Sequence, residues 1–477
     1  MAVFPSTQSL QRPVSRSLAN GAAESVVNLP NTVARYNMKY ALFMALTITF
    51  AVPAVSQTSS EPQASDDTQT AAPATLVGAR PSIRPLGELV NPNFVAGGIA
   101  ISQLYTDNAE LSTTGPISDL SYEIMPHLAI SSSAVRWSLN ADALAGFMLN
   151  RTLDNRNQAQ QSAGLDFSYR LSQFVTLRAS DQFTNSTGLW SGASSGGTST
   201  GAGIGSLQQP NNSQFTFGKF KTNVALAEIS GQFSADSYAG VRGTESYLWF
   251  PSSATDPVVG TLYGGNSYTA EAFYNRHFTA RNWGGITLRA QRFDLSHAIG
   301  RTDAVGVLLM YAVNITPSTS LSFFGGPELS MTATPNGIAL PVPAFQRRLW
   351  SPAAGAVFSW QGQRTGALAS FTHQVSNGGG LYSAVTLTTA EVQLQRQVGR
   401  HLEFGPSLTF SQNDPIVTSP SIRTYSGQLQ SSYRVGSCAF GAGYARDQRD
   451  AAAGSLTASA NRVWVSFSYD FIRTLGR

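Results

Sequence analysis

Polar and apolar side chains alternate with a period of two along most of the chain between residues 94 and 471. The alternation is clearest in residues 134–148, where the apolar set Val135, Trp137, Leu139, Ala141, Ala143, Ala145 and Phe147 interleaves with Arg136, Ser138, Asn140 and Asp142. Successive side chains of a β-strand point to opposite faces, so such a segment forms a ribbon with one apolar and one polar face. The pattern therefore predicts a chain built from strands after the N-terminal region.

Eighteen such segments are predicted, and sixteen is the alternative, because the alternation in 237–249 and 382–397 is imperfect. The predicted strands are 94–105, 119–130, 134–149, 162–171, 174–185, 222–234, 237–249, 267–278, 284–295, 303–315, 319–331, 352–361, 365–376, 382–397, 401–411, 422–434, 437–447 and 461–471. Short turns, such as Ala235–Asp236 and Gly399–Arg400, alternate with longer Gly-, Ser-, Asn- and Pro-rich connections, of which 187–213 is the longest. Short turns on one side and long loops on the other are typical of membrane barrels.

The composition distinguishes between a soluble β-protein and a membrane β-protein. Only 12% of the residues are charged, about half of the roughly 25% found in soluble domains. The polar faces carry mainly Ser, Thr, Gln and Asn, and aromatic residues recur near segment ends, where membrane barrels carry interfacial girdles. A mean hydropathy of −0.08 excludes a bundle of transmembrane helices. We therefore predict an all-β fold, a transmembrane antiparallel up-and-down β-barrel of 18 strands.

The N-terminal region is predicted to direct export and to take no part in the fold. Residues 1–56 contain basic Arg35 and Lys39, an apolar run over 40–52 and a small-residue cleavage site at 54–56, the pattern of a signal peptide. Met38 is the expected start residue, and an unusually long leader is the alternative. Residues 57–92 are predicted to form a flexible periplasmic linker, and 93–477 the barrel.

The last strand segment carries the feature that links this chain to a known class. Val465, Phe467, Tyr469 and Phe471 alternate with Ser466, Ser468 and Asp470. With the strand pattern of 94–471, this segment resembles the outer-membrane β-barrel proteins of Gram-negative bacteria. The resemblance is to a porin-like architecture and to no single family. It implies an outer-membrane location, contact with lipid, and recognition of Phe467, Tyr469 and Phe471 as an insertion signal by the barrel-insertion machinery. The chain departs from the pattern by continuing for six residues, Ile472 to Arg477.

Catalytic and metal-binding patterns are weak in this sequence. The five histidines, His127 and His297 among them, show no metal-binding spacing, and Gly192 to Gly196 matches the serine-nucleophile pattern G-x-S-x-G inside a Gly/Ser-rich stretch without a following helix. The single cysteine, Cys438, is expected to be a small lipid-facing side chain. We therefore predict no enzyme activity and no cofactor or metal, and the absence of basic runs predicts no nucleic-acid partner.

The candidate functional residues are charges on the predicted lumen faces: Arg136, Asp142, Arg178, Glu228, Glu271, Arg289, Glu403 and Arg434. Such residues set the electric field of a pore or simply form a solvated lining. The expected function is passive diffusion of small hydrophilic solutes through a porin-like channel. The alternatives are a surface barrel whose long loops bind a partner, a secreted soluble β-protein, and a barrel-embedded hydrolase.

Overall fold

A computed structural model describes residues 93–475, except 114, 154–156, 188–218, 251–254, 257–259, 262, 296–299, 334–345, 379–381, 417–420 and 452–455. The strands are β1 Phe94–Thr106, β2 Asp119–Ser133, β3 Trp137–Asn150, β4 Gln158–Arg170, β5 Val175–Thr187, β6 Lys219–Ser234, β7 Ser237–Trp249, β8 Thr255–Asp256, β9 Gly260–Thr261, β10 Gly265–His277, β11 Asn282–Leu295, β12 Gly300–Thr316, β13 Thr319–Ala333, β14 Gln346–Gln361, β15 Thr365–Gly378, β16 Tyr382–Val398, β17 Leu402–Pro415, β18 Ile422–Val435, β19 Cys438–Ala451 and β20 Leu456–Thr474. The predicted signal peptide and linker, His297 and the Gly192–Gly196 motif lie outside the described residues.

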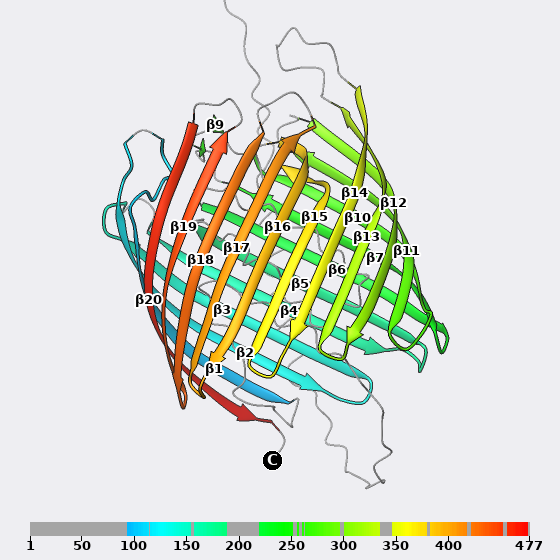
Figure 1. Cartoon of the computed structure of the whole chain (residues 1–477), viewed down its shortest axis with the longest axis horizontal. Helices are drawn as coiled ribbons and strands as arrows, with labels where there is room; N and C mark the ends of the chain where they lie inside the picture. The colour runs from blue at the N-terminus through cyan, green and yellow to red at the C-terminus, as the bar shows by residue number, and fades with distance from the viewer. Residues whose placement is uncertain are drawn as a thin grey trace, which may run out of the picture. The chain divides into compact units, whose positions relative to one another are not determined.

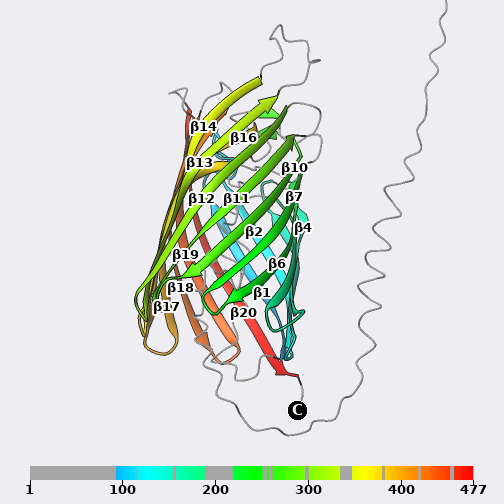
Figure 2. The same cartoon turned by 90° about the vertical axis from the view of Figure 1, so that its right-hand side faces the viewer.

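Eighteen of these strands form one antiparallel sheet that closes on itself (Figures 1 and 2). Closure occurs at β1, because Phe94 lies opposite Ser131 of β2 and also opposite Thr474 of β20. Closure joins the first strand to the last one, so the sheet has no terminal edge strand, which is what a hydrocarbon environment requires of strands that cross it. The predicted 18-strand up-and-down barrel is confirmed, and the alternative of sixteen strands is wrong. Within the described residues, β8 and β9 form a separate small hairpin.

The short and long connections lie at opposite ends of the barrel. At one end, short turns join β2 to β3, β4 to β5, β6 to β7, β10 to β11, β12 to β13, β14 to β15, β16 to β17 and β18 to β19. The first described strand, β1, starts at this end, and the last strand, β20, ends there. The predicted turns are confirmed at this end, with one correction. Strand β3 begins at Trp137 and not at residue 134, so Val135 and Arg136 lie in the exposed turn that follows β2. Gly399 and Gly436 occupy two other turns with φ of 68° and 58°, a backbone conformation that favours glycine.

The two faces of the wall differ as the alternation predicts. Large apolar side chains point outward and are exposed, for example Phe147 at 63%, Leu309 at 64% and Leu408 at 65%. The inward face carries hydroxyl, amide and charged side chains, many of them buried. The predicted insertion-signal residues Phe467, Tyr469 and Phe471 lie in β20, in the phase of the outward face. The described part of the chain contains no helix long and apolar enough to cross a membrane.

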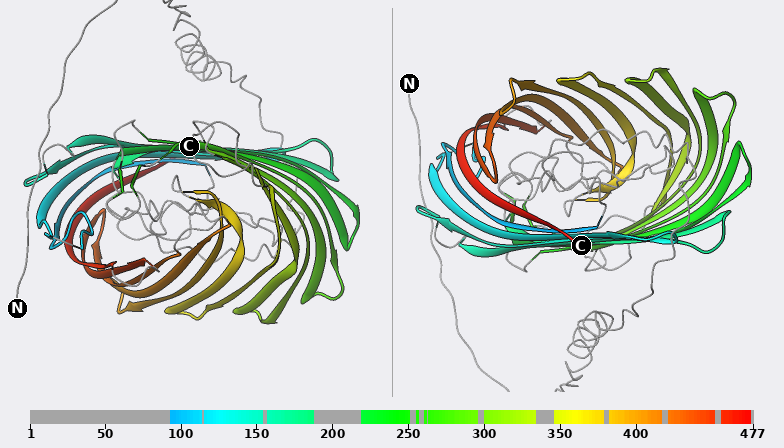
Figure 3. Two further views of the ribbon diagram at one scale, coloured as in Figure 1. Left: turned by 90° about the horizontal axis from the view of Figure 1, so that it is seen from above. Right: turned by 90° about the horizontal axis from the view of Figure 1, so that it is seen from below.

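One hairpin leaves the wall and enters the barrel. β14 pairs with β15 only from Ala354 opposite His373 to Gln361 opposite Gly366, although β14 pairs with β13 along its whole length. Beyond His373, β15 continues with β16 as its partner. Figure 3 shows these yellow strands bending into the interior in the views along the barrel. The end of the β15–β16 hairpin, residues 374–378 and 382–387, therefore lies inside the barrel, at the end with the long connections.

Candidate functional site: a charge ladder in the lumen

A row of oppositely charged side chains crosses consecutive strands on the inward face. The cross-strand partners, in order from β5 to β13, are Arg178, Glu228, Arg242, Glu271, Arg289, Gly306 and Glu328. The signs alternate at every step until Gly306. The strands place the row obliquely, since Arg178 is the fourth residue of β5 and Glu328 the tenth of β13 counted from the short-turn end. We call this row the charge ladder.

Arginine side chains form ion pairs at several steps of the charge ladder. Arg242 donates from Nε to Glu271 Oε2 at 2.9 Å and also from Nη2, and its Nη1 lies 3.6 Å from Glu228 Oε2. At the lower end, Arg178 turns to the neighbouring strand β4 and pairs with Asp166 at 2.5 Å. Opposite charges directly across a strand pair attract one another, so each step favours this register over a slipped one.

The step at β12 is bridged by a glycine. Arg289 on β11 reaches past Gly306 to Glu328 on β13, with Nη2 3.2 Å from Oε1. A Cβ atom at residue 306 would lie 3.6 Å from both Cβ and Cγ of Glu328 and 3.3 Å from the carbonyl oxygen of Pro327. Glu328 therefore packs against the glycine, and the guanidinium and carboxylate meet across an intervening strand that carries no side chain at this position.

The upper end of the charge ladder holds the inward hairpin in place. Arg289 donates from Nη1 to Gln374 Oε1 at 2.9 Å, and the backbone N–H of Val375 donates to Glu328 Oε2 at 3.1 Å. Val375 of β15 lies beyond the last residue that pairs with β14. The Glu328 carboxylate therefore accepts an amide hydrogen that β14 does not bond. Phe293, Ala304, Val375, Ala384 and Ile416 form an apolar cluster next to these bonds.

Burial increases along the charge ladder. The side chains of Arg178 and Glu228 are 16% and 20% exposed, whereas those of Arg289 and Glu328 are 0% and 1% exposed. Removing a charge from water is costly unless it is paired and hydrogen-bonded. At the strongly buried end, both Nη atoms of Arg289 and both carboxylate oxygens of Glu328 have partners, so the ladder contributes paired charge to the lumen wall.

The structure places the eight predicted residues in three environments. Arg178, Glu228, Glu271 and Arg289 meet in the charge ladder, and Arg136 lies in a turn outside the wall. Three others lie in the inward phase of distant strands: Asp142 on β3, Glu403 on β17, bonded to Gln395, and Arg434 at the end of β18. Sequence reasoning missed Arg242 and Glu328. Arg242 is in phase with Thr244 and Ser246 of its strand, and this polar phase is the signal that could have found it. Glu328 is likewise in phase with Ser322 and Ser330.

A second pair uses the same geometry at the seam of the barrel. His127 Nε2 on β2 lies 2.9 Å from Asp470 Oδ1 on β20, across Gly98 of β1. A Cβ atom at residue 98 would lie within 2.3 Å of the Tyr469 carbonyl oxygen and 2.8 Å of His127 Nε2. The pair therefore joins the second strand to the last one through a position that only glycine fits.

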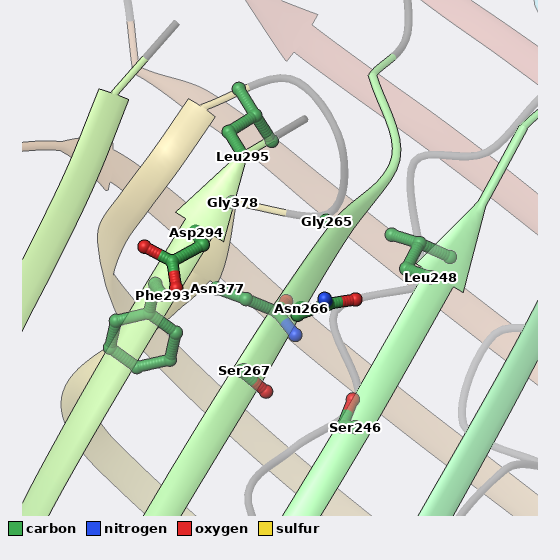
Figure 4. A pocket seen from close by; sticks show the side chains of 10 residues that line it. All are labelled: Ser246, Leu248, Gly265, Asn266, Ser267, Phe293, Asp294, Leu295, Asn377 and Gly378. Carbon is green, nitrogen blue, oxygen red and sulfur yellow. The ribbon is translucent and has the colours of Figure 1, made fainter. Parts of the chain in front are cut away.

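A pocket lies between the hairpin end and the wall, four residues along the strands from the charge ladder toward the long connections (Figure 4). Its lining comes from β7, β10, β11 and β15, and comprises Ser246, Leu248, Gly265, Asn266, Ser267, Phe293, Asp294, Leu295, Asn377 and Gly378. Hydroxyl and amide groups dominate its polar lining. Among the described residues, no group of three His, Cys, Asp or Glu side chains is placed to hold a metal ion.

Comparison with solved structures finds similar folds. The chain is similar to the outer membrane protein OpdK from Pseudomonas aeruginosa, with 8% identity and a TM-score of 0.40, over 80% of this chain and 99% of that one. It is also similar to OccK2 from the same organism, solved with glucuronate, at 9% identity and a TM-score of 0.40 over 80% and 98%. A third is OccAB4 from Acinetobacter baumannii, at 10% identity and a TM-score of 0.40 over 79% and 98%.

Comparison by sequence finds no counterpart. No protein-family model matches the chain, and no curated protein matches it either. The fold is therefore established by the strand pairing of the chain itself, which closes after eighteen strands.

Proposed function

We propose that this protein is a passive channel for small hydrophilic solutes across the bacterial outer membrane. The observation that carries the proposal is the division of the closed wall into an apolar exposed outer face and an inner face of hydroxyls, amides and paired charges. Barrels with about this number of strands are wide enough to enclose water. Neither a nucleophile nor a cofactor site enters this proposal.

The position in the membrane follows from the two ends of the barrel. Bacterial outer-membrane barrels keep their short turns on the periplasmic side and their long loops outside. The short-turn end, where Phe94 and Thr474 lie, is therefore the periplasmic end in this proposal. The partners are outer-membrane lipid along the apolar face and the insertion machinery at Phe467, Tyr469 and Phe471.

In this proposal the narrowest part of the channel is at the inward hairpin. It lies at the outer half of the barrel and is held by Arg289 and Glu328 through Gln374 and Val375. Solutes entering from outside would pass the hairpin end before they reach the wider part below. The paired charges of the ladder predict weak selection between anions and cations, since neither sign is left in excess along that wall.

Swelling of proteoliposomes tests the proposal. Purified protein is reconstituted, and the swelling rate is measured in isosmotic solutions of arabinose, glucose and raffinose. A channel gives rates that fall with solute size, and vesicles without protein give none. Rates at the protein-free level for the smallest sugar, from protein whose barrel is intact by its heat-dependent gel mobility, would overturn the proposal.

A further inference from the structure

Exposed arginines gather in the turns and on the outer face at the short-turn end of the barrel. Four lie in turns between neighbouring strands, and three lie in the outward phase of β10, β16 and β20. In that order they are Arg136, Arg281, Arg364, Arg400, Arg276, Arg396 and Arg473. Within the described residues, none of their side chains forms an ion pair. We call these seven residues the basic collar.

The charge outside the lumen at this end is almost entirely of one sign. Among the described residues there, the one exposed acidic side chain is Asp236, in the turn between β6 and β7. Glu403 and Asp470 face the lumen, where they bond to Gln395 and His127. The basic collar is therefore a surface of seven cations with a single exposed carboxylate beside it.

The other end of the barrel does not share this bias. There the outward phase carries both signs, because Arg292 and Arg301 pair with Asp303, and Asp414 and Asp450 lie near the ends of β17 and β19. The excess of positive charge is thus a property of the short-turn end and not of the outer face as a whole.

The outward members of the basic collar lie just beyond exposed aromatic side chains. On β10, Arg276 follows Tyr274 by one outward position, and on β20 Arg473 follows Phe471 in the same way. One outward position is two residues, about 7 Å along a strand. Aromatic side chains of membrane barrels lie at the membrane interface. An arginine one position nearer the end of the barrel therefore reaches the phosphate groups of the lipids.

The distribution of the basic collar favours lipid over a protein partner. Its members are spread around the rim, from β20 and the β2–β3 turn to the β10–β11, β14–β15 and β16–β17 turns. A bound protein would cover one arc of this rim, whereas a lipid leaflet surrounds it. Guanidinium groups bind phosphate oxygens through two parallel hydrogen bonds, and each basic side chain near a membrane surface adds attraction for anionic lipid.

We propose that the basic collar binds the phosphate groups of anionic phospholipids in the leaflet at the short-turn end. Phosphatidylglycerol carries a net negative charge, whereas the choline of phosphatidylcholine neutralises its phosphate. The lipid shell of the barrel is therefore enriched in the anionic lipid. The proposal shares with the proposed function the position of the barrel in a membrane, and it does not depend on an open lumen.

The test is the lipid selectivity of this shell. Barrels are reconstituted in phosphatidylcholine vesicles with a trace of spin-labelled phosphatidylglycerol or spin-labelled phosphatidylcholine. Electron paramagnetic resonance gives the motionally restricted fraction of each lipid, and hence the ratio of their association constants. The collar variant carries R276Q, R396Q and R473Q. The control variant removes three exposed arginines from the outward phase at the other end, and carries R348Q, R423Q and R446Q.

The basic collar predicts a wild-type ratio of about 2 to 5 at 0.1 M salt. The ratio should fall to about 1 at 1 M salt, where charges are screened within about 3 Å. The collar variant should lose at least half of the excess over 1, and the control variant should match the wild type, with both barrels intact by heat-dependent gel mobility. A wild-type ratio of 1, or an equal fall in the control variant, would overturn the lipid site and leave the channel function untouched. Barrels that keep the ratio but pass no solute would overturn the channel function alone.

Discussion

Arg289 and Glu328 form an ion pair across a strand to which neither belongs, with Nη2 and Oε1 3.2 Å apart over Gly306. The same two side chains bond Gln374 and the backbone N–H of Val375 in the inward hairpin. This pair therefore links the wall of the barrel to the hairpin end that lies inside it.

Removing one partner of this buried pair should be strongly destabilising. Arg289→Met or Glu328→Gln should each lower the free energy of unfolding by about 3–5 kcal/mol, because the other charge is left buried without its partner. The double variant should cost less than the sum, a coupling that double-mutant cycles measure. Denaturant unfolding in lipid vesicles provides the values. Additive costs would contradict a direct interaction between the two side chains.

Gly98 should tolerate no side chain. Gly98→Ala places a methyl group within 2.3 Å of the Tyr469 carbonyl oxygen and forces His127 and Asp470 apart, so the melting temperature of the barrel should fall. Gly243→Ala is the matched control, because a Cβ atom there meets nothing within 4 Å. Gel mobility after stepwise heating measures both. Equal melting of the two variants would show that the seam is looser than the contacts indicate.

The assignment of faces can be tested with one charge in two places. Leu309→Arg introduces a cation on the outward face in the middle of β12, and should cost about 2–4 kcal/mol of unfolding free energy in vesicles. Gln430→Arg introduces the same charge in the lumen and should cost far less. A larger loss of unfolding free energy in the lumen variant than in Leu309→Arg would contradict the assignment of the inner and outer faces.

Arg178 and Arg136, both of which the alternation pattern places on lumen faces, should differ in their effect on ion selectivity. Arg178→Ala leaves Asp166 in the lumen without its cation, so the reversal potential in a salt gradient should shift toward cation selectivity. Arg136→Ala removes an exposed charge from a turn and should leave the potential unchanged. A shift of the same size in both variants would place the selectivity at the turns instead of the ladder.

The barrel was predictable from the sequence to a large extent, because the period-two pattern is imposed by the two solvents that face each strand. The phase of Arg178, Glu271 and Arg289 follows from that pattern. The start of β3 did not, since Val135 is apolar and in phase with Trp137 yet lies in the turn.

The charge ladder and the hairpin were not predictable in this way. Which residues meet across strands depends on the register of each pair, and this is what aligns Arg242 with Glu228 and Glu271. The hairpin separates from β14 after His373, and Val375 then bonds to Glu328 of β13, a strand that is not its neighbour in the wall. Alternation within one strand carries no information about such contacts.

The most direct measurement is the single-channel conductance of the wild type beside a variant without the hairpin end. Replacing residues 376–385 by Asn-Gly joins Val375 to its cross-strand partner Thr386 through a tight two-residue turn. A lumen narrowed by the hairpin predicts stepwise conductance from both proteins, with a several-fold larger step in the shortened one. Equal steps would contradict the role of the hairpin, and intact barrels that pass no current in either form would contradict the channel itself.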